Sequence, residues 1–124
     1  MDLFEFARNC TEIDDYDDYL EIDLSVCHGV AGKVQSLLFV YAITDDKRFL
    51  DLANKYWKKV FVIDKKNGYY TGEKSRDYLL GYFLGWSGII DTAILLKNYN
   101  KGEKSYIPLN LSSESYQKEL FNIK

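Results

Sequence analysis

The sequence contains little proline, histidine and cysteine, and each scarcity limits what the protein can be. One proline in 124 residues favours helices over a loop-rich or sandwich fold. Two cysteines do not make the disulfide framework of a small secreted domain, so we expect a reduced, cytoplasmic protein. No segment resembles a signal peptide, and no run approaches the roughly 20 apolar residues of a membrane span.

The composition is that of a single folded domain, expected to span residues 1–124. Hydrophobic residues make up 47% of the chain and aromatic residues 16%, which a disordered segment does not reach. The charge is uneven, because residues 1–25 carry a net charge of −8 and the remainder carries +5. A modest basic surplus spread along helices is not the concentrated patch that phosphate binding requires. Nucleic acid is therefore not expected as a partner.

Apolar spacing predicts an all-α fold built from helical hairpins. The segments expected to be helical are 2–12, 29–42, about 47–62 and about 86–98, with a last turn near 116–121. The first helix has an apolar side formed by Leu3, Phe6, Ala7 and Cys10. In the third segment Phe49, Ala53, Tyr56 and Val60 are expected to point inward. Asp46 is expected to cap the start of that helix, and residues 64–68 to form the turn after it.

The acidic stretch at residues 14–23, DDYDDYLEID, raises the question of calcium. An EF-hand loop needs alternating oxygen ligands, a central glycine and a terminal glutamate at fixed offsets. Here the glycine is missing and the acidic residues come in pairs. We therefore expect a solvated connector rather than a calcium site.

Two of the predicted helices repeat one pattern. GVAGKVQSLLFVYA at 29–42 aligns with GWSGIIDTAILLKN at 85–98, so that equivalent residues lie 56 positions apart. Each segment begins Gly-x-small-Gly and continues with Ser36 or Thr92 and an apolar run. Two residues without Cβ on the first turn of a helix allow another backbone to approach closely. The repetition predicts a repeat architecture, in which each hairpin needs neighbours to bury its apolar face.

The dipeptide Cys27-His28, just before the first repeat, admits three interpretations. As a nucleophile with its base it is badly arranged, because neighbours on a helix point about 100° apart. At a loop-to-helix junction the two side chains could instead converge on one zinc ion. The third interpretation is a buried thiol beside a hydrogen-bonded imidazole. A catalytic zinc needs three protein ligands, and Cys10, the other cysteine, lies on a helical face that suits burial.

Ser-Val-Cys-His-Gly-Val-Ala-Gly, with the second repeat Gly-Trp-Ser-Gly, resembles the C-terminal portion of lanthionine synthetase C-like cyclases. The closing segment Tyr106-Ile107-Pro108-Leu109 also looks like that family's ending. The resemblance covers nearly the whole chain, which would then be a partial domain. It implies an α/α toroid in which Cys27 and His28 are zinc ligands at one end of a central cavity.

The resemblance also implies a chemistry. Cyclases of this family add a cysteine thiol of a ribosomally made precursor peptide to a dehydroalanine or dehydrobutyrine, as in lantibiotic biosynthesis. Zinc lowers the pKa of the thiol so that a thiolate is available at neutral pH. An acid then protonates the enolate that the addition forms. The partners implied are the dehydrated precursor peptide and an N-terminal cyclase part or a dehydratase.

The chain departs from the family pattern at two places. The family's third zinc ligand is a cysteine one hairpin upstream of Cys-His-Gly, and Cys10 lacks its flanking Trp and Gly. The acid–base histidine also lies upstream in the family, and His28 is the only histidine of this chain, so no catalytic residue is assigned. We therefore expect the isolated chain to bind zinc weakly or not at all, to lack cyclase activity, and to oligomerise, aggregate or dock on a missing part.

Two other functions remain open on the sequence. The chain could be a degenerate remnant or a peptide-binding module that keeps the helical hairpins without the chemistry. It could also be another α/α toroid, such as a sugar-processing enzyme. That activity needs paired acidic residues at the cavity rim, for which Asp77 and Asp91 are the only candidates.

Overall fold

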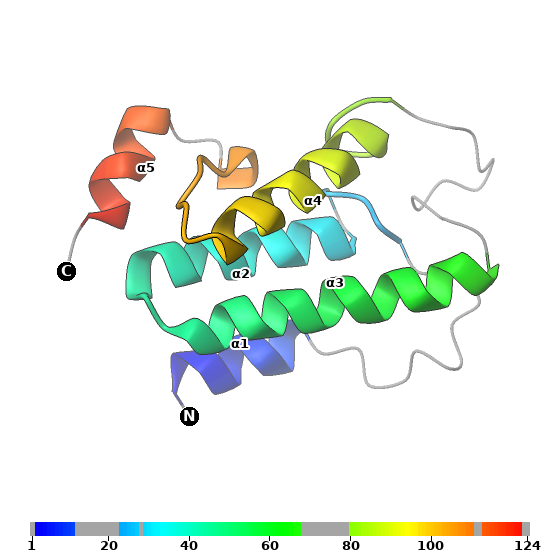
Figure 1. The fold of residues 1–124 in the computed structure, drawn as a ribbon, viewed down its shortest axis with the longest axis horizontal. Coiled ribbons are helices and arrows are strands. Elements are labelled where there is room, and N and C mark those ends of the chain that lie inside the picture. The colour runs from blue at the N-terminus through cyan, green and yellow to red at the C-terminus, as the bar shows by residue number, and fades with distance from the viewer. Residues whose placement is uncertain (1, 12–22, 28, 68–79, 111–112, 123–124) are drawn as a thin grey trace.

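The computed structural model of the chain describes residues 2–11, 23–27, 29–67, 80–110 and 113–122. These residues form helices and connecting segments and contain no β-strand, so the predicted all-α class is confirmed (Figure 1). The helices are α1 (Leu3–Thr11), α2 (Val30–Thr44), α3 (Lys47–Asn67), α4 (Trp86–Asn100), the short 3₁₀ helix η2 (Pro108–Asn110) and α5 (Glu114–Phe121).

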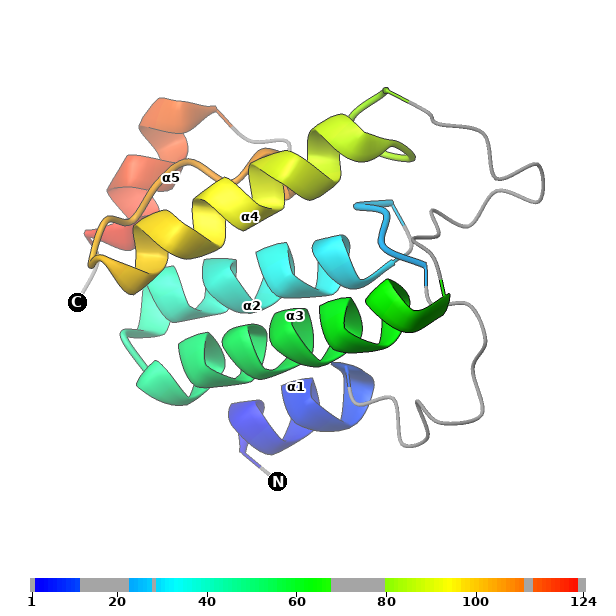
Figure 2. The ribbon, with the colours of Figure 1, turned by 45° about the vertical axis from the view of Figure 1, so that its right-hand side comes forward.

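Helix α2 is at the centre of the arrangement. It packs against α3 and α4 on different sides, while α1 lies against α3 (Figure 2). The segment containing η2 and α5 also contacts α2, and the rings of Phe39 and Phe121 meet edge to face at 5.9 Å. The core is formed mainly by the facing sides of α2, α3 and α4. Its largest fully buried side chains include Leu37, Leu38, Phe49 and Tyr99.

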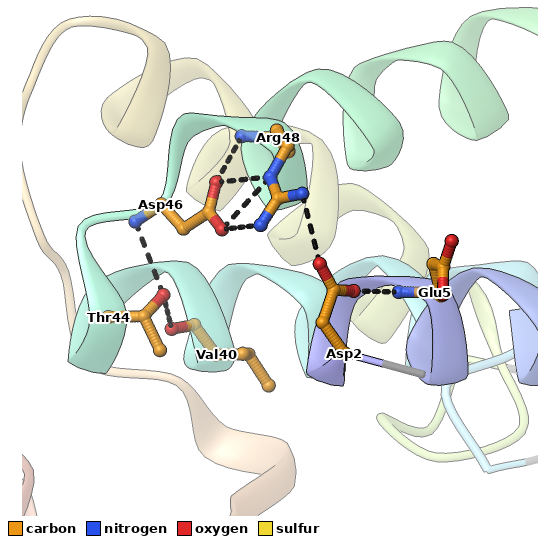
Figure 3. Close-up of polar contacts among 6 residues, drawn as sticks. All are labelled: Asp2, Glu5, Val40, Thr44, Asp46 and Arg48. Atoms are coloured by element: carbon orange, nitrogen blue, oxygen red, sulfur yellow. Dashed lines mark hydrogen bonds and ion pairs between the residues drawn. The ribbon is translucent and has the colours of Figure 1, made fainter.

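The α2–α3 hairpin turns at the residues that the sequence indicates (Figure 3). Asp45 ends α2 in the left-handed conformation with φ 54°, and its N–H donates to the Tyr41 carbonyl. The Asp46 carboxylate then accepts the backbone N–H of Arg48 at 3.0 Å and three further bonds from the guanidinium of Arg48. Asp46 therefore caps α3 as predicted. Arg48 also bonds Asp2, which caps α1 by accepting the Glu5 N–H at 2.8 Å.

Two details of the sequence prediction are wrong. In α1 the predicted apolar side is not the packed side, because Leu3 and Phe6 are 57% and 58% exposed. Phe4 packs inward instead, with its ring edge to face with Phe49 at 5.5 Å and beneath the Arg48 guanidinium. Helix α3 also continues to Asn67, through most of the predicted turn. Asp64, Lys65 and Lys66 can all extend a helix, so these positions are helical rather than a turn.

The remaining predicted helices are confirmed with small changes in their ends. Helix α4 extends two residues beyond the predicted end, and the last turn is the eight-residue helix α5. Ser113 caps α5, since its hydroxyl accepts the Tyr116 N–H. Of the predicted inward residues of α3, Phe49, Ala53 and Tyr56 are buried, and the side chain of Val60 lies outside the described part. None of the described helices is long and apolar enough to cross a membrane.

Candidate functional site

Cys27 lies on a turn directly before α2, and its side chain is exposed. Its neighbour Val26 is 1% exposed and anchors the turn in the core. The backbone N–H of Cys27 donates to the carbonyl of Phe83 at 2.8 Å. The thiol therefore projects from a backbone that the buried Val26 and the bond to Phe83 hold in place.

The segment before Cys27 folds over the start of α2. The N–H groups of Val30 and Ala31 donate to the carbonyls of Asp23 and Leu24 at 2.9 and 3.2 Å. The Asp23 carboxylate accepts the N–H of Ser25 at 2.7 Å and holds this segment in a tight turn. The free N–H groups of a helix start are thus partly satisfied by backbone, although Gly29 offers no capping side chain. This arrangement orients Cys27 without using a side chain of the helix.

The second glycine of each repeat allows the same close backbone approach. A Cβ at Gly32 would lie 2.1 Å from the carbonyl oxygen of Val26, and a Cβ at Gly88 would lie 1.9 Å from that of Tyr82. In both cases the carbonyl belongs to the residue six positions earlier. Gly29 and Gly85, which precede α2 and α4, have nearly equal backbone angles. The repeat predicted from sequence is therefore a repeat of structure.

The hydroxyl of each repeat also makes the same bond. Ser36 donates to the Gly32 carbonyl at 3.0 Å, and Thr92 donates to the Gly88 carbonyl at 2.7 Å. Each hydroxyl satisfies a carbonyl within its own helix, four residues earlier. The 56-residue register therefore holds for the glycine, the hydroxyl and the preceding turn.

The two repeats meet at the turn that carries Cys27. Phe83, whose carbonyl receives the Cys27 N–H, is the residue 56 positions after Cys27. A Cβ at Gly88 would also lie 2.6 Å from Cγ2 of Val26. The second repeat therefore forms the support on which the Cys27 turn lies, a role that the sequence alone does not reveal.

A buried polar network connects the two repeat helices. Gln35 is fully buried, and its amide nitrogen donates to the hydroxyls of Tyr82 and Thr92 at 2.9 and 2.8 Å. Its amide oxygen accepts the N–H of Leu109 at 3.2 Å. The Tyr82 hydroxyl in turn donates to Asp91 at 2.7 Å. The network ties α2, α4 and the η2 segment together.

The pKa of Tyr82 is raised by burial, and the hydrogen bond to Asp91 raises it further, while the bond from Gln35 opposes the shift. Because the folded pKa lies above the unfolded value of about 10, Tyr82 gives its full stabilisation below about pH 10. Above that pH the unfolded chain loses a proton that the folded state keeps. We expect the free energy of unfolding to fall between pH 10 and 12, and less steeply in Tyr82→Phe. Urea titrations at each pH would measure this, with exposed Tyr116→Phe as control; equal slopes in both variants would contradict it.

The candidate ligands and acids of the sequence analysis are only partly described. His28, the acidic stretch 14–22 and Asp77 lie outside the described residues, as does the side chain of Cys10. Asp91 lies on α4 and accepts the Tyr82 hydroxyl, which makes it a member of the polar network.

A zinc ion needs several donor side chains grouped around one point. In the described part of the chain, no three His, Cys, Asp or Glu side chains are grouped so that they could hold a metal. Cys27 is suited to be a ligand, because its thiol is exposed on a fixed turn and its neighbour His28 offers a second donor atom. A catalytic zinc site needs three protein ligands. Cys27 and His28 therefore do not by themselves fit a complete zinc centre.

Together these features define a class of all-α proteins whose repeated helices start at Gly-x-x-Gly turns. The model of the family described as lanthionine synthetase C-like protein matches residues 7–111. The chain therefore belongs to the lanthionine synthetase C-like family, whose fold is a helical toroid and whose members are generally zinc-binding. Membership suggests a lanthipeptide cyclase-type function on a peptide substrate. Searches of curated proteins and of solved structures found no match.

Proposed function

We propose that residues 1–124 are the C-terminal part of a zinc-dependent lanthipeptide cyclase, which adds peptide cysteine thiols to dehydroalanine or dehydrobutyrine to form thioether rings. The observation that carries this proposal is the position of Cys27. It is the exposed residue of a turn that both repeats hold in place, directly before the first repeat helix. A residue needed only for packing would be buried at this junction, as its neighbour Val26 is.

In this proposal Cys27 and His28 supply two of the three protein ligands of the zinc ion. The third ligand comes from the N-terminal part of the cyclase, which completes the toroid. The acid–base residue also comes from that part, and no residue of this chain is assigned a catalytic role. The chain acts in the cytoplasm on a precursor peptide that a dehydratase has already modified. Alone it is inactive.

A zinc titration of the isolated, reduced chain tests the incomplete site. We expect calorimetry to show no tight site, because two donors from adjacent residues leave the ion without its third protein ligand. Cys27→Ala should remove whatever weak binding remains, whereas Cys10→Ala should leave it unchanged. Cobalt absorption, which reports thiolate coordination, would give the same comparison.

A tight zinc site would contradict this expectation. One tight zinc site at a 1:1 ratio, abolished by Cys27→Ala, would show that the chain completes its own centre. If Cys10→Ala also abolished it, Cys10 would be the third ligand. Metal binding that Cys27→Ala left unchanged would exclude Cys27 as a ligand and would favour the non-catalytic remnant of the same fold.

A further inference from the structure

The segment 80–84, which leads into α4, provides the acceptor for the backbone of Cys27. The Cys27 N–H donates to the Phe83 carbonyl at 2.8 Å. The side chains of Leu80, Phe83 and Leu84 are 75%, 42% and 37% exposed, so they contribute little packing that could hold the segment in place. The position of this acceptor therefore depends on the other contacts of the segment.

Tyr82 is the residue of this segment that reaches α2. Its hydroxyl accepts a bond from the Gln35 amide at 2.9 Å and donates to the Asp91 carboxylate at 2.7 Å. Gln35 belongs to α2 and Asp91 to α4, so one hydroxyl bonds both repeat helices. A further side-chain bond, from Ser87 to the Leu80 carbonyl, connects the segment only to the first turn of α4. Tyr82 therefore fixes the segment relative to α2.

The two repeats hold this position in different ways. In the register of the repeat, Tyr82 is equivalent to Val26 and Phe83 is equivalent to Cys27. Val26 is 1% exposed and is held by burial, whereas Tyr82 is half-buried and is held by two hydrogen bonds. Hydrogen bonds depend on direction as well as distance. Because Phe83 is the next residue, the bonds of Tyr82 limit where the Phe83 carbonyl can lie.

We propose that Tyr82 is a positioning residue for Cys27. Gln35 lies in the second turn of α2 and Cys27 lies directly before that helix. The contacts from Gln35 through Tyr82 and Phe83 to Cys27 therefore connect the turn back to the helix that follows it. They hold the Cys27 backbone before any metal binds, and a ligand that is already in place loses less conformational freedom on binding. The inference rests on the proposed function only for the identity of Cys27 as a zinc ligand.

Tyr82→Phe tests the proposal, because it removes the hydroxyl with both of its bonds and leaves the ring. Amide hydrogen exchange of the metal-free, reduced chain, followed residue by residue by NMR, reports the bond between Cys27 and Phe83 directly. We expect the Cys27 N–H to exchange about tenfold faster than in the wild type, since the segment opens locally without its hydrogen bonds. The N–H of Val30, which donates to the Asp23 carbonyl at the same junction, should keep its exchange rate.

Tyr99→Phe is the matched control. The Tyr99 hydroxyl is also partly buried and donates to the Ser105 carbonyl at 2.8 Å, but it belongs to the last turn of α4, at the opposite end from Phe83. Its removal should lower the free energy of unfolding and leave the exchange of the Cys27 N–H unchanged. Asp91→Ala removes one of the two bonds of Tyr82 and should therefore give a smaller increase in exchange than Tyr82→Phe.

The thiol gives a second readout. With Cys10→Ser in every variant, the rate at which Cys27 reacts with a small neutral alkylating reagent should change in Tyr82→Phe and not in Tyr99→Phe. Unchanged exchange of the Cys27 N–H in Tyr82→Phe would overturn the proposal, and so would an equal increase in Tyr99→Phe. Metal binding that Cys27→Ala left unchanged would contradict the proposed function and not this inference, because exchange is measured without metal.

Discussion

Replacing Gly88 by alanine is expected to lower the free energy of unfolding by about 3 kcal/mol, near the upper end of the cost of inserting a methyl group into a packed site. The added Cβ would lie 1.9 Å from the carbonyl oxygen of Tyr82 and 2.6 Å from Cγ2 of Val26. The first contact is with backbone, which cannot rotate away as a flexible side chain can. The turn before α4 must therefore move as a whole.

Helix propensity alone predicts the opposite sign for this change. Alanine is favoured over glycine inside a helix by about 1 kcal/mol, and α4 contains Gly88 in its first turn. The steric cost exceeds that gain because the close approach leaves no room for any Cβ. Gly32→Ala should be similarly destabilising, since its Cβ would lie 2.1 Å from the Val26 carbonyl.

Urea unfolding of Gly88→Ala, Gly32→Ala and Gly81→Ala would measure these effects. Gly81 is the matched control, because no atom lies within 4 Å of a Cβ placed there and its φ is not positive. Its substitution should change stability by no more than about 0.5 kcal/mol. Similar midpoints for Gly88→Ala and Gly81→Ala would mean that the turn does not pass so close to α4.

A second measurement connects Gly88 to the candidate metal ligand. Because Val26 is next to Cys27, a displaced Val26 side chain also displaces the turn that carries the thiol. Under native conditions, Gly88→Ala should therefore change the rate at which Cys27 reacts with a small alkylating reagent, whereas Gly81→Ala should not. Cys10→Ser in every variant leaves Cys27 as the single reactive site. Equal alkylation rates in Gly88→Ala and Gly81→Ala would mean that Gly88 contributes to stability without supporting the Cys27 turn.

The helices could be predicted from the sequence because a long amphipathic segment has only one apolar face that it can bury. Phe49, Ala53 and Tyr56 follow helical spacing and are buried where expected. Helix α1 is different, because nine residues with apolar groups on two sides fit more than one orientation. The ring of Phe49 and the guanidinium of Arg48 select Phe4, and both lie more than 40 positions further along the chain.

For the candidate site, the sequence predicted only which residues of the two repeats are equivalent. The 56-residue repeat identified the glycines and the hydroxyl pair, and the structure gives each pair the same contact. The bond between Cys27 and Phe83 could have been suspected from that register, since these residues are equivalent. The contact of Gln35 with Tyr82 could not, because 47 positions separate them and only the packing of α2 on α4 brings them together.

Gln35→Glu is expected to be the most damaging substitution in the buried network, although it hardly changes the shape of the side chain. The amide nitrogen of Gln35 donates to two hydroxyls that already donate their own protons, to Asp91 and to the Gly88 carbonyl. A carboxylate in this place would face two acceptors without a proton between them. An uncompensated buried charge costs about 3–5 kcal/mol.

Gln35→Leu is the matched variant, because leucine has a similar size and introduces no charge. Both hydroxyls would keep their own acceptors, and only the N–H of Leu109 would lose its partner. One unsatisfied buried donor costs about 1–3 kcal/mol. At pH 7 the expected order of stability is therefore wild type, then Gln35→Leu, then Gln35→Glu, measured as the free energy of unfolding in urea.

The pH dependence distinguishes this explanation from a loss of packing. Burial beside Asp91 should raise the folded pKa of the carboxyl introduced by Gln35→Glu above its unfolded value of about 4.3. A group with a raised folded pKa stabilises the protein when protonated, so stability relative to Gln35→Leu should increase as the pH falls through that pKa. The protonated acid can then donate to Tyr82 or Thr92 as the amide does. A constant difference between the two variants from pH 7 to 4 would show that the donor directions in this network are not those described.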